Sequence, residues 1–370
     1  MKKRVVIAGL GDTGLLVALH LHPEFDVVGI TPKPCLVSGQ ELGTRLARPD
    51  AWRENFLMAY SRYRRLDGMP VVQGLTTRID SERRQVVVRS QDGVERELEY
   101  DALVIASGVT NGFWRDAAIE DTAAIDGRID SDAERFAKAS RIAVLGGGAT
   151  GVSAASNLKD VYPAKDVHLF FSQEQLLPSY HPKVRSEVEA QLRNQGVVLH
   201  PGHRARLPDG FEGEQLTSGA VEWSTGQPAF LADVVLWAVG RQRPNTGFLA
   251  PGMLDASGYV KVDSELRVPG AQDVFAVGDV AASDPNRCSA RNGGALTVAH
   301  NVRCALSGRE TRMKQFKPAP HRWGSILGLQ REGMRVFSAT GGNFRIPAWL
   351  VERVLFPWIV RRGIYKGVRD

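Results

Sequence analysis

Two glycine-rich segments of the chain have the spacing that binds the phosphates of a dinucleotide. The first, GLGDTG at residues 9–14, follows the apolar run 5–8 and precedes a helix-like run at 15–20. A strand, a glycine turn and a helix start give a tight turn, close backbone approach to a pyrophosphate, and free N–H groups at the helix N-terminus. An ordinary tight turn without a ligand is the alternative.

The second segment, GGGATG at residues 146–151, repeats this pattern 137 residues later. The apolar run 142–145 precedes it, and a helix-like run at 152–158 follows it. Two copies in one chain predict two dinucleotide sites on two α/β units.

Polar residues at strand ends are the next candidates for cofactor contacts. The strand-like run after the first glycine-rich segment ends at Thr31, where a dinucleotide site commonly has an Asp or Glu that binds the ribose. The run after the second glycine-rich segment ends at Ser172, so neither an acid nor an arginine decides between NADH and NADPH. The run 273–279 does end in a carboxylate, Asp279, which can bind a polyol hydroxyl of a cofactor or cap a helix.

Three cysteines and one histidine are the remaining candidates for chemistry. Cys35 is either a redox thiol facing a flavin or an ordinary loop cysteine. With Cys288 and Cys304 it forms neither a CxxC pair nor a metal-ligand cluster, so the sequence predicts no disulfide framework and no metal site. His300 is a candidate proton donor or a structural residue. It lies on a predicted helix whose start, near 291–297, would stabilise negative charge on a reduced flavin.

Other segments must position these residues. Residues 40–66 predict a helix in which Arg45 could reach a pyrophosphate. The apolar run 101–106 stops at Ser107 and Gly108, which let the backbone pass close to a ligand. Three short runs predict an antiparallel meander: 76–80, 85–89 and 95–98.

Composition is that of a globular protein. The chain has 370 residues, of which 43% are hydrophobic and 24% charged. It has no uninterrupted apolar stretch of the roughly 20 residues that a membrane helix needs. No apolar signal-peptide core follows the first residues, so we expect a cytoplasmic protein.

The C-terminal region carries the positive charge of the chain. Residues 309–370 contain thirteen Lys or Arg and four Asp or Glu, a net +9, whereas residues 1–308 carry −3. Region 346–368 predicts an amphipathic helix, kinked at Pro357, that lies on a membrane surface. Core packing, a dimer contact, a nucleic-acid surface and a solvated face are the alternatives. Its apolar stripe is Leu350, Val351, Val354, Leu355, Trp358 and Ile359.

Five segments together resemble a known family. VVIAGLGDTG, DALVIASG, IAVLGGGATG, DVVLWAVGRQRPN and DVFAVGDV have the order and spacing of the pyridine-nucleotide oxidoreductase flavoproteins. Within that superfamily the chain is similar to the AIF-like ferroptosis-suppressor quinone reductases and the type II NADH dehydrogenases. The resemblance implies a split FAD domain at 1–109 and 243–308, an inserted NAD(P)H domain at 110–242, and a C-terminal region at 309–370.

The resemblance also implies roles for residues at matching positions. Residues 11–14 should hold the FAD pyrophosphate, with Arg45 and Thr76 near FAD and Asp279 on its ribityl chain. Residues 148–151 should cradle NADH or NADPH. The predicted cofactor-binding set is Gly9, Gly11, Asp12, Thr13, Gly14, Thr31, Arg45, Thr76, Ser107, Gly108, Asp279, Gly146, Gly148, Ala149, Thr150, Gly151, Ser172 and Gly240.

The implied reaction is hydride transfer from NAD(P)H to flavin N5, followed by two electrons to a quinone or another small acceptor. Ser153 departs from the glutamate that many relatives have near the nicotinamide. The alternatives are a disulfide, peroxide or O₂ reductase that uses Cys35, and an AIF-like redox-sensing or binding protein with weak turnover. We expect a membrane surface, here the inner face, rather than nucleic acid as the larger partner; the sequence leaves the oligomeric state open.

Overall fold

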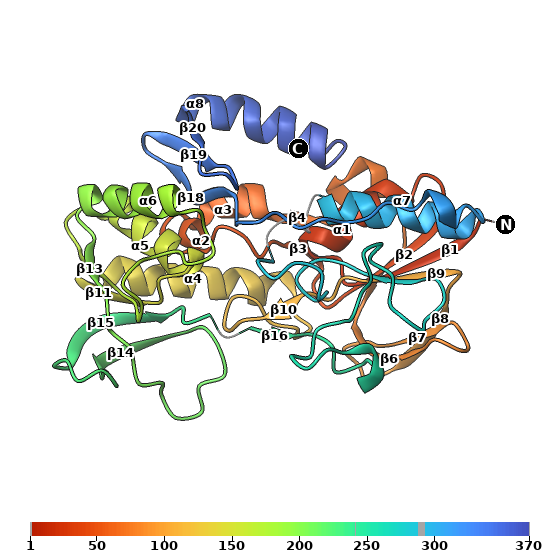
Figure 1. The fold of residues 1–370 in the computed structure, drawn as a ribbon, viewed down its shortest axis with the longest axis horizontal. Coiled ribbons are helices and arrows are strands. Elements are labelled where there is room, and N and C mark those ends of the chain that lie inside the picture. Colours follow the sequence, from red (N-terminus) through yellow and green to blue (C-terminus); the bar gives the residue numbers. More distant parts are fainter. Residues whose placement is uncertain (1, 241, 288–292, 370) are drawn as a thin grey trace.

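The computed structural model describes residues 2–240, 242–287 and 293–369 and contains two five-stranded sheets in that part of the chain (Figure 1). The first has the order β17-β9-β1-β2-β5 and is parallel throughout. Its strands are β1 (Arg4–Ala8), β2 (Asp26–Thr31), β5 (Val71–Gln73), β9 (Ala102–Ile105) and β17 (Val274–Ala276). Because β17 follows the second sheet in the chain, the first sheet is completed by a distant segment.

The first sheet is buried on both faces, which explains why its strands read as continuous apolar runs. Val5 and Ile7 of β1 belong to the core on one face, and Val6 and Ala8 to the core on the other. Helices α1 (Asp12–Leu21) and α7 (Ala295–Leu306) pack together over the first of these faces.

The second sheet has the order β13-β12-β11-β15-β14, in which only the edge strand β14 is antiparallel to its neighbour among the described strands. Its strands are β11 (Arg141–Leu145), β12 (Asp166–Phe170), β13 (Val198–His200), β14 (Gln215–Val221) and β15 (Phe230–Trp237). Its helices are α4 (Thr122–Lys138), α5 (Ala149–Val161) and α6 (Pro182–Gln195). The fold is therefore α/β with two dinucleotide-binding units, as predicted; the domain boundaries at 109, 242 and 308 stay a prediction.

The antiparallel meander is confirmed as β6 (Leu75–Asp80), β7 (Gln85–Arg89) and β8 (Glu95–Glu99). The single helix expected over 40–66 is wrong. Pro49 starts a second helix directly after the first, and the chain then turns into a strand. The elements of this stretch are β3 (Cys35–Val37), α2 (Leu42–Ala47), α3 (Pro49–Phe56), β4 (Leu57–Ala59), η1 (Tyr60–Arg62) and η2 (Arg64–Leu66). The other short elements are β10 (Val109–Thr110), β16 (Arg243–Pro244), η3 (Pro251–Met253) and η5 (Glu310–Arg312).

The C-terminal region forms a small antiparallel sheet and a helix that runs along the top of Figure 1. The sheet contains β18 (Gly324–Gln330), β19 (Gly333–Phe337) and β20 (Asn343–Ile346). The helix is α8 (Ala348–Leu350) continued by the π-helical η6 (Val351–Ile364), so it is shorter than the predicted 346–368. No helix in the described part of the chain is long and apolar enough to cross a membrane.

The π-helical geometry changes which side chains face the protein. A π-helix bonds residue i to i+5, as the amide of Tyr365 does to the carbonyl of Val360 at 2.9 Å. Val360 and Ile364 therefore pack against the core that contains α1 and α7, whereas Trp358 and Ile359 are more than half exposed. The predicted stripe does not lie on one face: Val351 is buried, whereas Trp358 and Ile359 are exposed, as a stripe on a membrane surface would be.

The chain end is fastened to the first unit. The ring of Tyr365 is buried edge-on against Tyr63, with ring centroids 5.4 Å apart. Val368 forms a β-bridge with Tyr63, and Arg369 pairs with Asp67. At the other end of the region, the side chain of Asn157 on α5 donates to the carbonyl of Leu327 at 2.8 Å. The C-terminal region thus packs against both α/β units.

Candidate functional site

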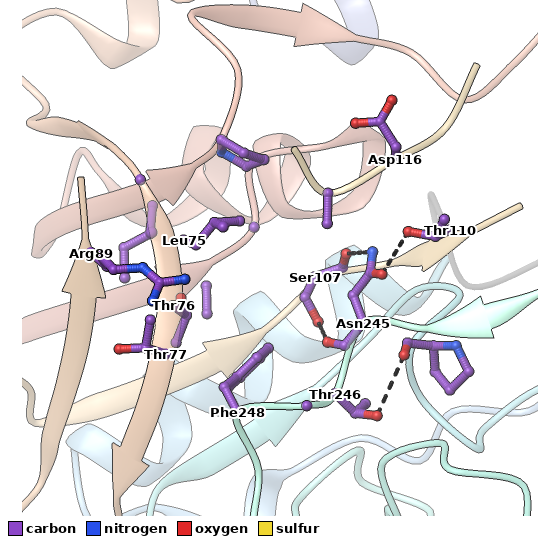
Figure 2. Close-up of a pocket in the computed structure, with 18 of the residues that line it drawn as sticks. Leu75, Thr76, Thr77, Arg89, Ser107, Thr110, Asp116, Asn245, Thr246 and Phe248 are labelled. Carbon is purple, nitrogen blue, oxygen red and sulfur yellow. Dashed lines mark hydrogen bonds between the residues drawn. The ribbon is translucent and has the colours of Figure 1, made fainter. Parts of the chain in front are cut away.

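Two adjoining cavities lie at the carboxyl ends of β1, β2 and β9, where ligands bind in open parallel sheets. The outer cavity, of about 700 Å³, lies between the meander and residues 243–248 (Figure 2). The inner cavity, of about 390 Å³, lies against the glycine turn before α1. Both are lined by Gly9, Pro32, Ser107, Asp116 and Asn245, so they form one elongated site.

The first glycine turn has the geometry that its sequence requires. Gly9 has a positive φ of 108°, and a Cβ there would lie 2.4 Å from the carbonyl oxygen of Ala106. A Cβ on Gly14 would lie 1.8 Å from the oxygen of Gly9. Gly11 faces open space, and α1 begins after it without a side-chain cap from any described residue. The first N–H groups of α1 can therefore bind a phosphate.

The second glycine turn repeats this construction. Gly146 has a φ of 126°, and a Cβ there would lie 2.0 Å from the carbonyl oxygen of Ala238. A Cβ on Gly151 would lie 2.0 Å from the carbonyl oxygen of Gly146. Gly148 faces open space at the start of α5, again without a side-chain cap among the described residues. Thr150, two residues into this turn's helix, lines the inner cavity. Both cradles thus fit the phosphates of a dinucleotide.

The other predicted contacts fall in several places. Thr76 lines the outer cavity, and Thr31, Gly108 and Asp279 line the inner one. Ser107 lies in both, and its Oγ donates to the carbonyl of Asn245 at 2.7 Å (Figure 2).

The remaining predicted residues belong to the second unit. Ala149 starts α5 within the second glycine turn. Ser172 is exposed just beyond β12, and Gly240 takes a positive φ of 81° just beyond β15. These residues follow the carboxyl ends of the neighbouring strands β11, β12 and β15. A nucleotide bound at the start of α5 would extend over this edge of the sheet.

Arg45 lies elsewhere than expected. Its side chain is 1% exposed and donates to the carbonyl of Trp114 at 3.2 Å and to Asp132 at 3.5 Å. Burial lowers the pKa of Arg45 to about 10, against the raising effect of Asp132. Because α2 directs this guanidinium towards α4, Arg45 lies outside the residues that line the two cavities, and the contact predicted for it is wrong.

A different arginine lies in the inner cavity. The guanidinium of Arg115 is 2.8 Å from the carboxylate of Asp279. Burial alone would lower the pKa of Arg115, but the charge and hydrogen bond of Asp279 outweigh it and raise the pKa. Sequence reasoning did not identify Arg115, because no motif marks the segment between β10 and α4.

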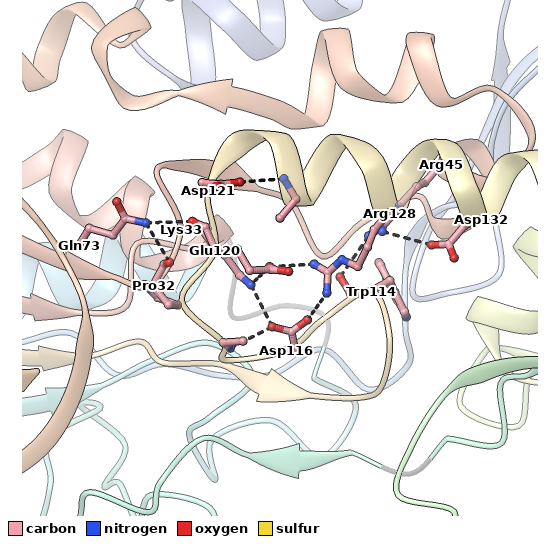
Figure 3. A network of polar contacts seen from close by, with 12 residues as sticks. Pro32, Lys33, Arg45, Gln73, Trp114, Asp116, Glu120, Asp121, Arg128 and Asp132 are labelled. Atoms are coloured by element: carbon pink, nitrogen blue, oxygen red, sulfur yellow. Dashed lines mark hydrogen bonds and ion pairs between the residues drawn. The ribbon is translucent and has the colours of Figure 1, made fainter. Parts of the chain in front are cut away.

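A four-charge network borders the same cavity (Figure 3). Lys33 and Arg128 each pair with both Asp116 and Glu120; Asp116 lies 2.9 Å from Lys33 and 2.7 Å from Arg128. Although burial would raise the pKa of Asp116, the hydrogen bonds from both cations lower it. The network was not predicted, since Lys33 lies 83 residues before Asp116 in the sequence and only the fold brings it to the other three residues.

The candidate reactive side chains differ in position. Cys35 lines the inner cavity, but burial raises the pKa of its thiol to about 11, so it is protonated at neutral pH. His300 lies outside the lining of both cavities, and its Nε2 donates to the carbonyl of Arg312 at 2.9 Å. That position does not fit the proton donor expected. Cys288 and the start of 291–297 lie outside the described residues. Among the described residues, no group of three Asp, Glu, His or Cys side chains could hold a metal ion.

The C-terminal region closes part of the inner cavity. Arg322 lines it beside Tyr180, and the two residues form a parallel β-bridge. The Nε of Arg322 donates to the carbonyl of Asn286 at 2.6 Å, which fixes the side chain. Segments before β18, between β12 and α6, and after β17 thus meet at one wall.

Comparison with known proteins agrees with this geometry. The family model for pyridine nucleotide-disulphide oxidoreductases matches residues 3–303. Oxidoreductase ptaL of Pestalotiopsis fici is 28% identical, covering 78% of this chain and 75% of that protein. Ferroptosis suppressor protein 1 of Xenopus tropicalis is 26% identical, covering 85% of this chain and 83% of that protein. The structure of NDH2 from Plasmodium falciparum in complex with NADH superposes with a TM-score of 0.60 at 17% identity, covering 76% of this chain and 65% of that one.

Proposed function

The chain belongs to the pyridine nucleotide-disulphide oxidoreductase family, and we propose that it is an FAD-dependent NAD(P)H:quinone oxidoreductase. FAD and NAD(P)H are its cofactors. In the net reaction NAD(P)H and one proton convert a quinone to its quinol and leave NAD(P)⁺. Bound FAD supplies the two-electron relay between donor and acceptor.

One observation supports the transfer step above all. The inner cavity is lined by Thr13 of α1 and by Thr150 of α5, the helices that follow the two glycine turns. Dinucleotides held on these two helices would therefore extend into the same space. The chain's part is to hold both in reach of each other and to exclude water.

A quinone acceptor is favoured over a thiol-based reaction. A disulfide or peroxide reductase needs a thiolate, yet the pKa of Cys35 is raised by burial. The other described cysteine, Cys304, lies on α7 beside His300 and outside the lining of the inner cavity. A quinone needs no nucleophile, only access to the cavity.

Anaerobic stopped-flow mixing tests the proposal. Flavin absorbance should bleach on addition of NADH or of NADPH, which identifies the donor, and should return on addition of a soluble ubiquinone analogue. A bleached flavin that the analogue leaves reduced, but that a disulfide or O₂ reoxidises, would contradict the acceptor. A yellow protein that neither nucleotide bleaches would contradict the enzyme and favour the redox-sensing alternative.

We further propose that the C-terminal region binds an anionic membrane surface, from which a lipid-soluble quinone could reach the cavity. Four apolar side chains of this region are each more than half exposed: Phe344, Trp349, Trp358 and Ile359. Cations accompany them; the guanidinium of Arg362 lies 5.0 Å from the centroid of the Trp358 ring, and Arg353 is exposed. Aromatic side chains beside cations are typical of interfacial helices on anionic lipids.

Vesicle sedimentation tests the membrane proposal, with phosphatidylcholine alone and with added phosphatidylserine. Each Arg near an anionic surface contributes about 1 kcal/mol, so R353Q/R362Q should weaken binding to the anionic vesicles roughly 30-fold. R193Q, on the exposed face of α6, is the matched control. Equal binding to both vesicle types, or no effect of the double substitution, would contradict it. Deleting the region is less informative, because Tyr365 is part of the core.

A further inference from the structure

We infer that Arg115 binds the diphosphate of FAD, the role that the sequence suggested for Arg45. The first glycine turn and α1 mark where that diphosphate lies, and Arg115 lines the same inner cavity. The inference concerns cofactor binding and is independent of which acceptor the enzyme uses.

Arg115 is held over the start of α1. Its terminal nitrogen lies 2.8 Å from Asp279, which follows β17. Its Nε lies so near Gly39 that a Cβ on that glycine would be only 2.8 Å away. The amide of Gly39 in turn donates to the carboxylate of Asp12, the first residue of α1, at 2.9 Å. The guanidinium therefore lies between the loop at Gly39 and the two carboxylates.

The charges at this position call for a cation. Asp12 and Asp279 both line the cavity that must accept a doubly charged diphosphate. Asp12 is hydrogen-bonded by Ser38 at 2.7 Å as well as by the loop amide, which disperses its charge. Asp279 is neutralised by Arg115. Without Arg115 the phosphate would face these two carboxylates, and the N–H groups at the start of α1 would have to offset their charge.

The geometry of a guanidinium suits both partners at once. It has five N–H donors in a planar fork, and the pair with Asp279 uses a terminal nitrogen. The remaining donors can bind phosphate oxygens in the bidentate manner that makes arginine a common phosphate ligand. Arg115 would thereby hold Asp279 beside the ribityl chain while binding the diphosphate.

Other cations of the inner cavity are engaged elsewhere. Lys33 and Arg128 are each shared between Asp116 and Glu120, and the four groups together are neutral (Figure 3). Arg322 donates to a backbone carbonyl at the far wall, and the guanidinium of Arg287 lies 3.8 Å from the centroid of the Tyr259 ring. Arg115 is thus the cation best placed at the glycine turn among the described residues.

Ligand binding to the full-length apoprotein tests the inference without NAD(P)H or quinone. In R115Q the dissociation constant for FAD, measured by flavin fluorescence, should rise roughly 10- to 100-fold, the loss expected for a charge-assisted hydrogen bond. Calorimetry should show a similar loss for ADP and none for adenosine, which lacks phosphate. R115K, which keeps the charge but loses the fork, should fall between wild type and R115Q, and R193Q should match wild type.

Two results would overturn the inference. One is an FAD dissociation constant in R115Q within twofold of wild type. The other is an equal loss for ADP and adenosine, which would show that Arg115 only maintains the shape of the cavity. Should R115Q fail to fold, the ratio of ADP to adenosine affinity in R115K decides: a ratio unchanged from wild type rejects the role. Failure of quinone reduction alone would leave these binding results intact.

Discussion

Replacing Glu214 by Gln should stabilise the protein above neutral pH and have a much smaller effect in mild acid. Glu214 precedes β14 and is 4% exposed. The side-chain carboxyl of Glu214 accepts a hydrogen bond from the indole of Trp114, and its backbone N–H donates to the backbone carbonyl of Asn111 at 2.9 Å. Burial raises the pKa of Glu214 to about 7, and the Trp114 hydrogen bond and the Arg115 charge offset it only in part.

The sign and size of the effect follow from proton linkage. An acid whose pKa is higher in the folded than in the unfolded protein costs stability when it ionises. The stability is complete below the unfolded value of 4.5 and is lost as pH rises from there to about 7. At about 1.4 kcal/mol per pH unit the loss is about 3 kcal/mol. Gln keeps the shape and the acceptor for Trp114 but has no charge to bury.

Urea unfolding at pH 5, 6, 7 and 8 measures the difference. E214Q should exceed wild type by less than about 1 kcal/mol at pH 5 and by up to about 3 kcal/mol at pH 8. E212Q is the matched control, because Glu212 is an exposed neighbour whose side chain is 74% accessible and pairs with Arg243. A stability difference independent of pH, or a less stable E214Q at pH 8, would refute the argument.

Two further predictions concern the glycine turns and the cavity thiol. In G146A a Cβ would meet the oxygen of Ala238, so this variant should lose NAD(P)H binding and keep FAD, whereas G9A should lose FAD. Flavin absorbance and nucleotide titration of both variants distinguish the two sites. Identical losses in both variants would contradict two separate cradles. C35S should keep quinone turnover within about twofold, since Ser matches a protonated thiol in size; steady-state assay measures it, and abolished activity would favour the thiol reductase.

Local sequence was sufficient for the two cradles. A positive φ at Gly9 and Gly146 and close approach at Gly14 and Gly151 depend on residues a few positions apart, which a motif records directly. Strands buried on both faces likewise read as apolar runs, and the meander as alternating ones. The fold class and both cofactors could therefore be predicted.

Helical periodicity failed where geometry departed from the standard helix. In the π-helical η6, Val351 is buried and Val360 and Ile364 pack against the protein, while Trp358 and Ile359 are exposed. The apolar residues that a period of 3.6 places on one stripe therefore do not share a face. The single helix predicted over 40–66 failed for a different reason: Pro49 starts a second helix, and residues 57–59 then pair as β4 with β3.

Pairings between distant segments were decided only by the tertiary structure. The sequence suggested Arg45 as the phosphate ligand and gave no signal for Arg115, yet Arg45 is buried against Asp132 and Arg115 lies beside Asp279. The network of Lys33, Asp116, Glu120 and Arg128 joins segments that only the folded chain brings together. The sequence determined where the backbone forms the two glycine turns that fit a phosphate, because those turns depend on local φ and sterics. The tertiary structure decided which charges surround it, because Coulomb energies depend on distance in space.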